Sequence, residues 1–255
     1  MPTRDQAPLG APCWIDLLTS DPDSTRPFYE ELFGWKAEEA NPDFGGYFSF
    51  LRDGQPIAGG MRNDGQAGTA DQWNVYLATA EADATTRAVT DYGGQVYSPA
   101  MAVMDLGTMA VLGDPGGAMI STWQPGTHPG FTTLAEPGAP AWFELHTRDY
   151  DKAVRFYQDV FGWETQVASD TPDFRYTTFV CDVGPLAGIM DDTVLPSDSE
   201  VPHWAVYFQV EDTDAAVGQA TELGGSVIHD PTDSPFGRLA TLADPTGAQF
   251  RVTAP

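Results

Sequence analysis

The sequence is poor in basic residues, in cysteine and in long apolar runs. Its 255 residues contain 12 lysines and arginines against 37 aspartates and glutamates, a formal net charge of −25. Such an acidic surface repels phosphate backbones and anionic lipid, so we expect neither nucleic-acid nor membrane partners. Cys13 and Cys181 are too few for a disulfide framework, and free thiols are predicted. No run approaches the roughly 18 apolar residues that span a bilayer, and no signal peptide is recognisable, so we expect a cytoplasmic protein.

The most informative feature that is present is an internal duplication. The segment APCWIDLLTSD, which starts at Ala11, returns as APAWFELHTRD from Ala139. The pattern of Phe-Tyr followed by Phe-Gly-Trp at 28–35 returns at 156–163, about 128 residues later. A stretch dense in proline and glycine separates the copies and is typical of a linker. The predicted parts are a first domain, a linker and a second domain, at 1–124, 125–138 and 139–255.

Each copy shows the same order of elements twice. Residues 14–19 alternate between two faces as a strand does, and Asp21-Pro22-Asp23 then predicts an acidic helix cap, with Gly34 ending the helix. Short strands follow before the order restarts, so each copy is predicted to contain two βαβββ units. The Gly-Gly pairs after the second helices are interpreted as C-caps. In copy one, the second unit is predicted as a strand, a helix and three strands at 73–79, 82–92, 95–97, 108–112 and 118–123.

This order resembles the vicinal oxygen chelate superfamily, with Phe-Tyr and Leu-Phe-Gly-Trp in the first helix and Asp-Pro-x-Gly-Ala before the last strand. That family includes glyoxalase I, bleomycin-resistance proteins, fosfomycin-resistance enzymes and extradiol dioxygenases. The resemblance covers nearly the whole chain and looks closest to tandem-repeat actinobacterial members described as hydroxylases. It implies an α+β fold of two tandem glyoxalase-like domains, in which paired units curl mixed sheets into cups with the helices outside. One such fold hosts many reactions.

The resemblance also implies a divalent metal, which family enzymes hold with His and Glu side chains inside the cup. A further ligand would fall within Gln55–Met61 and Gly184–Met190, which contain no Asp, Glu or His. Several of the remaining ligand positions hold Trp or Arg, whose indole and guanidinium groups cannot ligate a metal. We therefore expect no metal and no other cofactor, and the metal-dependent reactions of the family are disfavoured. The other positions, carried over residue by residue, fall on Trp14, Asn74 and Ser121 in copy one and on Trp142, Ala205 and Arg251 in copy two.

The first strand of copy two carries a candidate acid/base pair. Glu144 and His146 share one strand face about 7 Å apart, because a strand advances about 3.3 Å per residue. They are the candidate catalytic residues, as general acid and base. The alternatives are a polar pair at the mouth of the cup, or the beginning of a non-standard divalent metal site. Arg251 can recognise a ligand carboxylate or phenolate, or can pair with Glu144 and silence both.

Large aromatic side chains share the cup-facing register and suit a flat, mostly apolar ligand. The alternative is that they fill the cups and leave no cavity. His203 is expected near a cup rim, whereas His128 and His229 are expected to be solvated. The candidate ligand-binding residues are Trp14, Asp16, Asn74, Tyr76, Trp142, Tyr207 and Arg251.

Two functions are compatible with these features. The first is a small-molecule-binding protein that holds an aromatic or planar molecule in a cup without a metal, as the resemblance to the bleomycin-resistance branch implies. The second is a lyase, isomerase or hydroxylase that acts on a small metabolite through Glu144 and His146, with or without a non-standard metal. A structural role without a ligand is favoured only by the missing metal ligands. Four units can build two cups in one chain, so monomer and homodimer both stay open.

Overall fold

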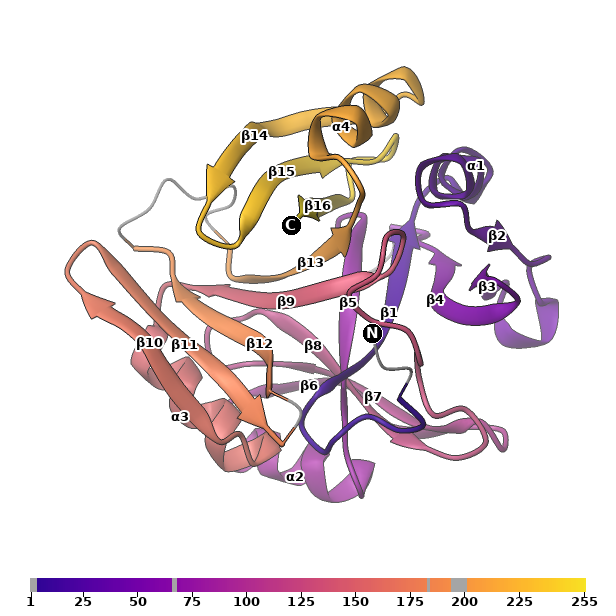
Figure 1. The fold of residues 1–255 in the computed structure, drawn as a ribbon. Coiled ribbons are helices and arrows are strands. Elements are labelled where there is room, and N and C mark those ends of the chain that lie inside the picture. Colours follow the sequence, from indigo (N-terminus) through magenta and orange to yellow (C-terminus); the bar gives the residue numbers. More distant parts are fainter. Residues whose placement is uncertain (1–3, 66–67, 183, 194–200) are drawn as a thin grey trace.

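The structure is a computed structural model that describes residues 4–65, 68–182, 184–193 and 201–255. Within these residues the chain forms two eight-stranded mixed sheets, one in each copy, and four α-helices (Figure 1). The predicted α+β fold of two tandem domains, with two βαβββ units in each, is confirmed.

Copy one forms the first sheet. Its elements are β1 (Pro12–Thr19), α1 (Pro22–Phe33), β2 (Lys36–Ala37), a short 3-10 helix (Pro42–Phe44), β3 (Phe48–Arg52), β4 (Gln55–Arg62), β5 (Gln72–Ala78), α2 (Ala82–Asp91), β6 (Gln95–Val103), β7 (Gly107–Gly113) and β8 (Met119–Pro125). The strand order is β2-β3-β4-β1-β5-β8-β7-β6. The first strands of the two units, β1 and β5, therefore meet antiparallel at the centre.

Copy two repeats this arrangement in the second sheet. Its elements are β9 (Pro140–Thr147), α3 (Tyr150–Phe161), β10 (Thr165–Thr171), β11 (Phe174–Cys181), β12 (Gly184–Asp191), β13 (His203–Gln209), α4 (Thr213–Glu222), β14 (Ser226–Ser234), β15 (Gly237–Ala243) and β16 (Gln249–Ala254). The order is β10-β11-β12-β9-β13-β16-β15-β14, with β9 and β13 antiparallel at the centre.

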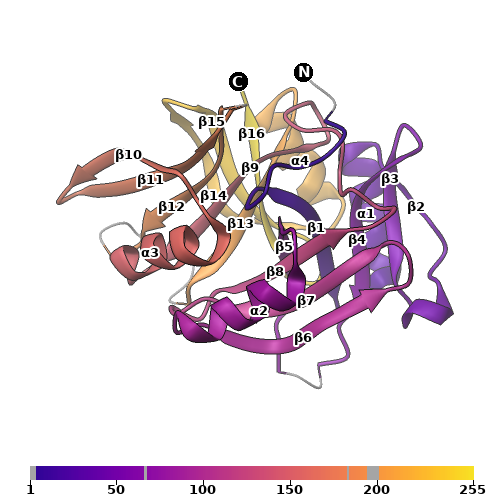
Figure 2. The same ribbon diagram turned by 90° about the horizontal axis from the view of Figure 1, so that it is seen from below.

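The strands pair within a copy, whereas the helices pack across copies. Sequence patterns alone do not indicate whether units associate within a copy or across copies. Helix α1 lies against α4 and helix α2 lies against α3, so each contact joins the first unit of one copy to the second unit of the other (Figures 1 and 2). The two domains therefore share one interface that has approximate two-fold symmetry.

Two buried tyrosine–aspartate hydrogen bonds tie this interface together. Tyr29 on α1 donates to Asp244 Oδ2 at 3.0 Å, and Tyr157 on α3 donates to Asp114 Oδ2 at 3.4 Å. In both cases a tryptophan of the tyrosine's own copy donates to the tyrosine oxygen at 3.0 Å. The aspartates open the Asp-Pro-x-Gly-Ala motifs, so each motif of one copy accepts a hydrogen bond from the first helix of the other.

The glycine pairs after α2 and α4 have two different roles. Both glycines of each pair were interpreted as C-caps, but only the first one has a positive φ. The second provides room at the interface. A Cβ at Gly94 would lie 3.0 Å from the Phe156 ring, and one at Gly225 would lie 2.9 Å from the Phe28 ring. These glycines therefore let a helix of the other copy approach closely.

The ends of α1 follow the sequence prediction only in part. Gly34 ends the helix in the left-handed conformation, as predicted. Asp21 is the N-cap residue, but its side chain makes no capping hydrogen bond, so the expected acidic cap was wrong in this detail. Pro22 begins the helix, where its missing N–H is not needed.

The linker packs into the core. Phe131 is buried, its ring lies 5.8 Å from the Phe143 ring of copy two and parallel to it, and it lies 6.3 Å from Trp14 of copy one. The Phe131 N–H also donates to the Cys13 carbonyl at 2.9 Å. Both cysteines are free, as predicted. No helix in the described residues is long and apolar enough to cross a membrane.

Candidate functional site

Strand register collects the predicted residues of copy one on one face of the first sheet. Between β1 and β5, Trp14 is paired with Tyr76 and Asp16 with Asn74, and between β5 and β8 Tyr76 is paired with Ser121. Directly paired residues point to the same side of a sheet. The five residues therefore share one face, which we call the first cup.

Asp16 is the centre of a buried hydrogen-bonded cluster in the first cup. It is 5% exposed. Its Oδ1 accepts from Trp14 Nε1 at 2.9 Å and from the Tyr47 hydroxyl at 2.8 Å, and its Oδ2 accepts from the Tyr76 hydroxyl at 2.6 Å. Trp14 Nε1 is also 3.0 Å from the Tyr47 oxygen. Burial raises the pKa of Asp16 above its ordinary value, and the three hydrogen bonds only partly oppose this.

Copy two builds the same cluster around Glu144, on the face that we call the second cup. The Tyr176 hydroxyl donates to Glu144 Oε2 and the Tyr207 hydroxyl to Oε1, both at 2.6 Å. Trp142 Nε1 donates to the Tyr176 oxygen at 2.9 Å. Each cup therefore holds one carboxylate between two tyrosines, with a tryptophan on the first tyrosine.

Cations distinguish the second cup from the first. His146 Nε2 lies 3.0 Å and Arg251 Nη1 lies 3.2 Å from Glu144 Oε1, and His146 Nδ1 lies 2.9 Å from Asp192 Oδ1. Burial alone would raise the pKa of Glu144, but the hydrogen bond and charge of His146 and the charge of Arg251 lower it to about 2. Burial lowers the pKa of His146, yet its bonds to Asp192 and Glu144 raise it overall. The His203 ring stacks on His146 at 4.9 Å.

The predicted acid/base pair is thus brought together, but inside an ion-paired network. Glu144 has partners on both oxygens, and Arg251 donates both to it and to Tyr207. A carboxylate whose pKa is lowered by His146 and Arg251 is a weak proton acceptor. The pairing of Arg251 with Glu144, which was one of the two alternatives for Arg251, is the one that the geometry shows. The catalytic roles of Glu144 and His146 stay predictions.

Glycines make room for the two clusters. Gly59 on β4 is paired with Asp16, and Gly188 on β12 is paired with Glu144. A Cβ at Gly59 would overlap the Tyr47 hydroxyl and Asp16 Oδ1, and a Cβ at Gly188 would overlap the Tyr176 hydroxyl. Both glycines lie in the segments where a further metal ligand was sought. Instead of a ligand, each glycine leaves the space that a tyrosine hydroxyl from the neighbouring strand region occupies.

A cavity of about 970 Å³ opens beside the Asp16 cluster. Of the predicted residues, Trp14, Asp16 and Tyr76 line it, together with Tyr47, but Asn74 does not. Trp142, Tyr207 and Arg251 belong to the second cup and lie outside this cavity. Open space therefore borders the first cup, although Trp14 and Tyr76 are themselves buried.

Exposed apolar side chains surround the cavity. Met101 and Met104, from β6 and the turn after it, are 53% and 74% exposed, and Met61 and Leu106 are each 36% exposed. All four belong to the cavity lining. Contiguous apolar exposure of this kind marks a binding surface more often than an ordinary solvated face.

The polar lining of the cavity is acidic. Besides Asp16 it contains Glu38, Glu39 and Asp43, and its residues include no lysine or arginine. The cavity is therefore unfavourable for a ligand anion, in contrast with the ionic network of the second cup.

His128 belongs to this cavity, contrary to the expectation that it is solvated. It is half-buried, and its ring lies edge-on to Trp14 at 4.5 Å. Burial lowers the pKa of His128. His229 is exposed, as expected.

Sequence reasoning missed the tyrosine that each carboxylate shares with a tryptophan. Tyr47 and Tyr176 occupy matching places, about 129 residues apart, just before β3 and within β11. A full alignment of the copies would have paired them. Asp192, which follows β12, carried no comparable signal. Asn74 faces Ser121, donating from Nδ2 at 2.8 Å, while its Oδ1 accepts no hydrogen bond from the described residues.

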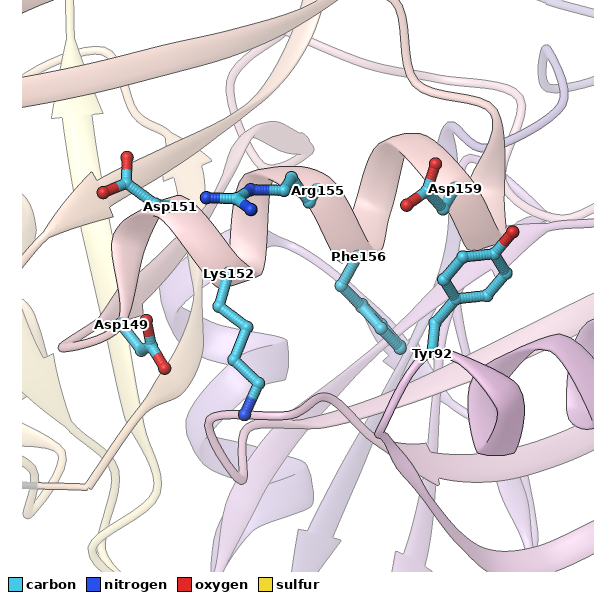
Figure 3. A pocket seen from close by; sticks show the side chains of 7 residues that line it. All are labelled: Tyr92, Asp149, Asp151, Lys152, Arg155, Phe156 and Asp159. Carbon is cyan, nitrogen blue, oxygen red and sulfur yellow. The ribbon is translucent and has the colours of Figure 1, made fainter.

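A second hollow, of about 380 Å³, lies where α2 meets α3 (Figure 3). It is lined mainly by charged side chains along α3, with Phe156 and Tyr92 facing each other at one end. None of the predicted site residues contributes to it. It is a polar groove at the domain interface rather than a second ligand site of the cup type.

A comparison with protein families identifies the chain. The family model described as "Glyoxalase/Bleomycin resistance protein/Dioxygenase superfamily" matches residues 13–122 and 139–252. The anthracycline biosynthesis protein DnrV of Streptomyces peucetius is 40% identical over 95% of this chain and 92% of its own length. The putative glyoxylase CFP32 of Mycobacterium tuberculosis is 36% identical over 100% of this chain and 98% of its own. The chain belongs to this superfamily.

Solved structures share the fold. The Mn(II)-bound glyoxalase of Novosphingobium aromaticivorans superposes with a TM-score of 0.66 at 18% identity, covering 96% of this chain and 82% of that one. The 2,3-dioxygenase LapB of Pseudomonas sp. KL28 gives 0.65 at 14%, covering 97% and 92%.

The residues at the family's metal positions do not fit a divalent ion. In the first cup Trp14 offers only an N–H donor, and Asn74 and Ser121 offer only neutral oxygens. In the second cup Ala205 has no donor atom and Arg251 is a cation. The described residues also contain no group of three or more His, Cys, Asp or Glu that could hold a metal.

Proposed function

We propose, for this member of the glyoxalase superfamily, that the first cup binds a flat, mostly apolar aromatic molecule without a metal ion. The observation that carries the proposal is the cavity of about 970 Å³ beside Trp14. Its volume is at the upper end of the roughly 300–1,000 Å³ typical of small-molecule sites. A molecule of three or four fused rings is small enough to enter it.

The chemistry of the wall supports an aromatic ligand. Trp14 and Tyr76 present rings, and Met61, Met101 and Met104 present flexible, polarizable thioethers that adapt to a flat surface. Copy two keeps Met190 in the place of Met61, but its stretch 226–243, which corresponds to the one that carries Met101 and Met104, contains no methionine. This difference supports a site in the first cup.

The names of relatives point in the same direction. Two Streptomyces proteins, each 40% identical to this chain, are named as anthracycline biosynthesis proteins. Anthracyclines are fused-ring aromatic molecules. This supports the ligand class, but it does not decide between a binding protein and an enzyme.

The enzymatic alternative, with Glu144 and His146 as acid and base, has weaker support. Glu144 is ion-paired with Arg251, and the Nδ1 of His146 with Asp192. No feature of the second cup favours turnover over a structural network, so binding in the first cup is the function that the geometry supports best.

Equilibrium dialysis tests the proposal with two fused-ring probes, fluorene and fluorenone. We expect saturable binding of one molecule per chain, unchanged after exhaustive treatment with a chelator. Replacing the exposed Met101 and Met104 together by glutamine should weaken binding of both probes about tenfold, because about 1.4 kcal/mol of apolar contact is lost.

The matched control replaces Val167 and Val227, which are exposed apolar residues of copy two, by glutamine. It should leave the affinity unchanged. Non-saturable uptake, or equal weakening in both double variants, would contradict the proposal. Loss of binding after chelation would contradict its metal-free part.

A further inference from the structure

The Asp16 cluster meets the cavity as a set of hydroxyl and carboxyl groups. Asp16, Tyr47 and Tyr76 all line the cavity, and the two tyrosines bond to different oxygens of the carboxyl group. Gly59 carries no side chain at the place where a Cβ would overlap Tyr47 and Asp16. The backbone therefore accommodates this cluster at the wall of the proposed ligand site.

The number of protons in the cluster decides what it offers to a ligand. When Asp16 is ionised, the hydrogens of Trp14, Tyr47 and Tyr76 all point at its two oxygens, so no donor is left for the cavity. When Asp16 is protonated, its own O–H donates to one tyrosine oxygen. That tyrosine then turns its hydrogen away from Asp16, and the cavity gains a donor.

The surroundings of Asp16 favour the protonated form. The face of β5 contributes the neutral Asn74 and Tyr76, β4 contributes Gly59, and the linker contributes His128, whose pKa burial lowers. The other titratable lining groups are the acids Glu38, Glu39 and Asp43. No cation of the lining stabilises an ionised Asp16, and burial raises its pKa.

We propose that Asp16, Tyr47 and Tyr76 form a hydrogen-bond-donating subsite that selects, among flat aromatic ligands, those with an uncharged acceptor oxygen such as a ketone or quinone carbonyl. Selection operates when Asp16 is protonated. A phenolate or carboxylate ligand is disfavoured, because the lining is acidic. This inference rests on the proposed function, since it assigns the polar contact within the same cavity.

Fluorene and fluorenone are the probes, because they have the same fused-ring shape and differ by one carbonyl oxygen. The quantity measured is the ratio of their affinities by equilibrium dialysis, followed upward from the ordinary carboxyl pKa of 3.8 over the whole pH range in which the protein stays folded. We expect wild-type protein to prefer fluorenone by about tenfold at the acidic end, the value of one net hydrogen bond of about 1.4 kcal/mol. The ratio should fall towards one as the pH rises and Asp16 ionises.

Variants assign this preference to the cluster. Asp16→Asn should hold the ratio high at every pH, because the amide remains neutral and donates to a tyrosine as the protonated acid does. Tyr47→Phe combined with Tyr76→Phe should bring the ratio to about one at every pH. Tyr176→Phe, the counterpart of Tyr47 in the second cup, is the matched control and should keep the wild-type profile. Circular dichroism confirms folding of each variant.

The results that would overturn the subsite differ from the result that would refute the proposed function. Equal affinities of wild-type protein for the two probes at all pH values would overturn the subsite while leaving the proposed function intact. A wild-type pH profile in Asp16→Asn, or a ratio that survives the double tyrosine substitution, would also overturn it. Failure of both probes to bind would instead refute the proposed function.

Discussion

The ionic network of the second cup yields a quantitative prediction for Arg251→Met. Arg251 Nη1 lies 3.2 Å from Glu144 Oε1. At an effective dielectric constant of about 20, this distance corresponds to about 5 kcal/mol of attraction before desolvation is subtracted. The displacement of the pKa of Glu144 from 4.5 to about 2 bounds the net value more tightly. It corresponds to about 3 kcal/mol for the favourable partners after the cost of burial has been subtracted.

His146, 3.0 Å from the same oxygen, carries part of that stabilisation and stays in the variant. We therefore expect Arg251→Met to lower the free energy of unfolding by about 2 kcal/mol at pH 7, and the melting temperature by about 4–8 °C. A lowered folded pKa contributes stability that is fully present above 4.5 and is lost as the pH falls towards about 2. The deficit of the variant should accordingly shrink at about pH 3.

Urea unfolding of wild type, Arg251→Met, Glu144→Gln and the double variant gives the coupling energy directly. The double variant should be more stable than additivity predicts by about 2 kcal/mol, since removing both charges leaves no buried ion without a partner. An Arg251→Met variant within about 0.5 kcal/mol of wild type would refute the reasoning. So would a deficit that grows on acidification.

Other substitutions test the clusters and the interface. Gly59→Ala and Gly188→Ala should each lower the free energy of unfolding in urea by about 1–3 kcal/mol, because the added Cβ overlaps a tyrosine. Only Gly59→Ala should also weaken binding of fluorene. Equal effects of the two variants on binding would contradict the assignment to the first cup. Tyr29→Phe should cost about 1–2 kcal/mol, because buried Asp244 loses a donor, and an unchanged unfolding midpoint would show that this interface bond contributes nothing. Because burial raises the folded pKa of Asp16, its contribution to stability should fall as the pH rises from about 3.8. Asp16→Asn should remove that fall. An identical pH profile of unfolding in both proteins would show that the folded pKa of Asp16 is not raised.

Strand alternation and the internal repeat were enough to predict which residues of the central strands share a face in each copy. Alternation along one strand put Trp14 and Asp16 on the same face, and the duplication then placed Trp142 and Glu144 likewise. Pairing of the first strands of the two units completed each cup with a tyrosine, Tyr76 in copy one.

The remaining site residues depend on loops and long-range approach, which periodicity does not encode. Tyr47 reaches Asp16 only because β4 has a glycine between them. Strand β6 was predicted to end at 97, but it continues to Val103 and thereby brings Met101 to the cavity. His128 belongs to the linker, and no periodic pattern there predicts its contact with Trp14.

The two cups show how few positions separate a closed network from an open site. Arg251 on β16 and Ser121 on β8 occupy the same register beside their tyrosines, and His146 on β9 corresponds to Leu18 on β1. In the second cup, the buried carboxylate of Glu144 is ion-paired with Arg251 and His146. Its hydrogen-bonding capacity is therefore used within the protein. The first cup has Ser121 and Leu18 at these positions, so the Asp16 carboxylate can be neutralised by protonation instead. On the proposed function, the second cup thus uses its carboxylate within the protein, whereas the first cup keeps a polar group available to a ligand.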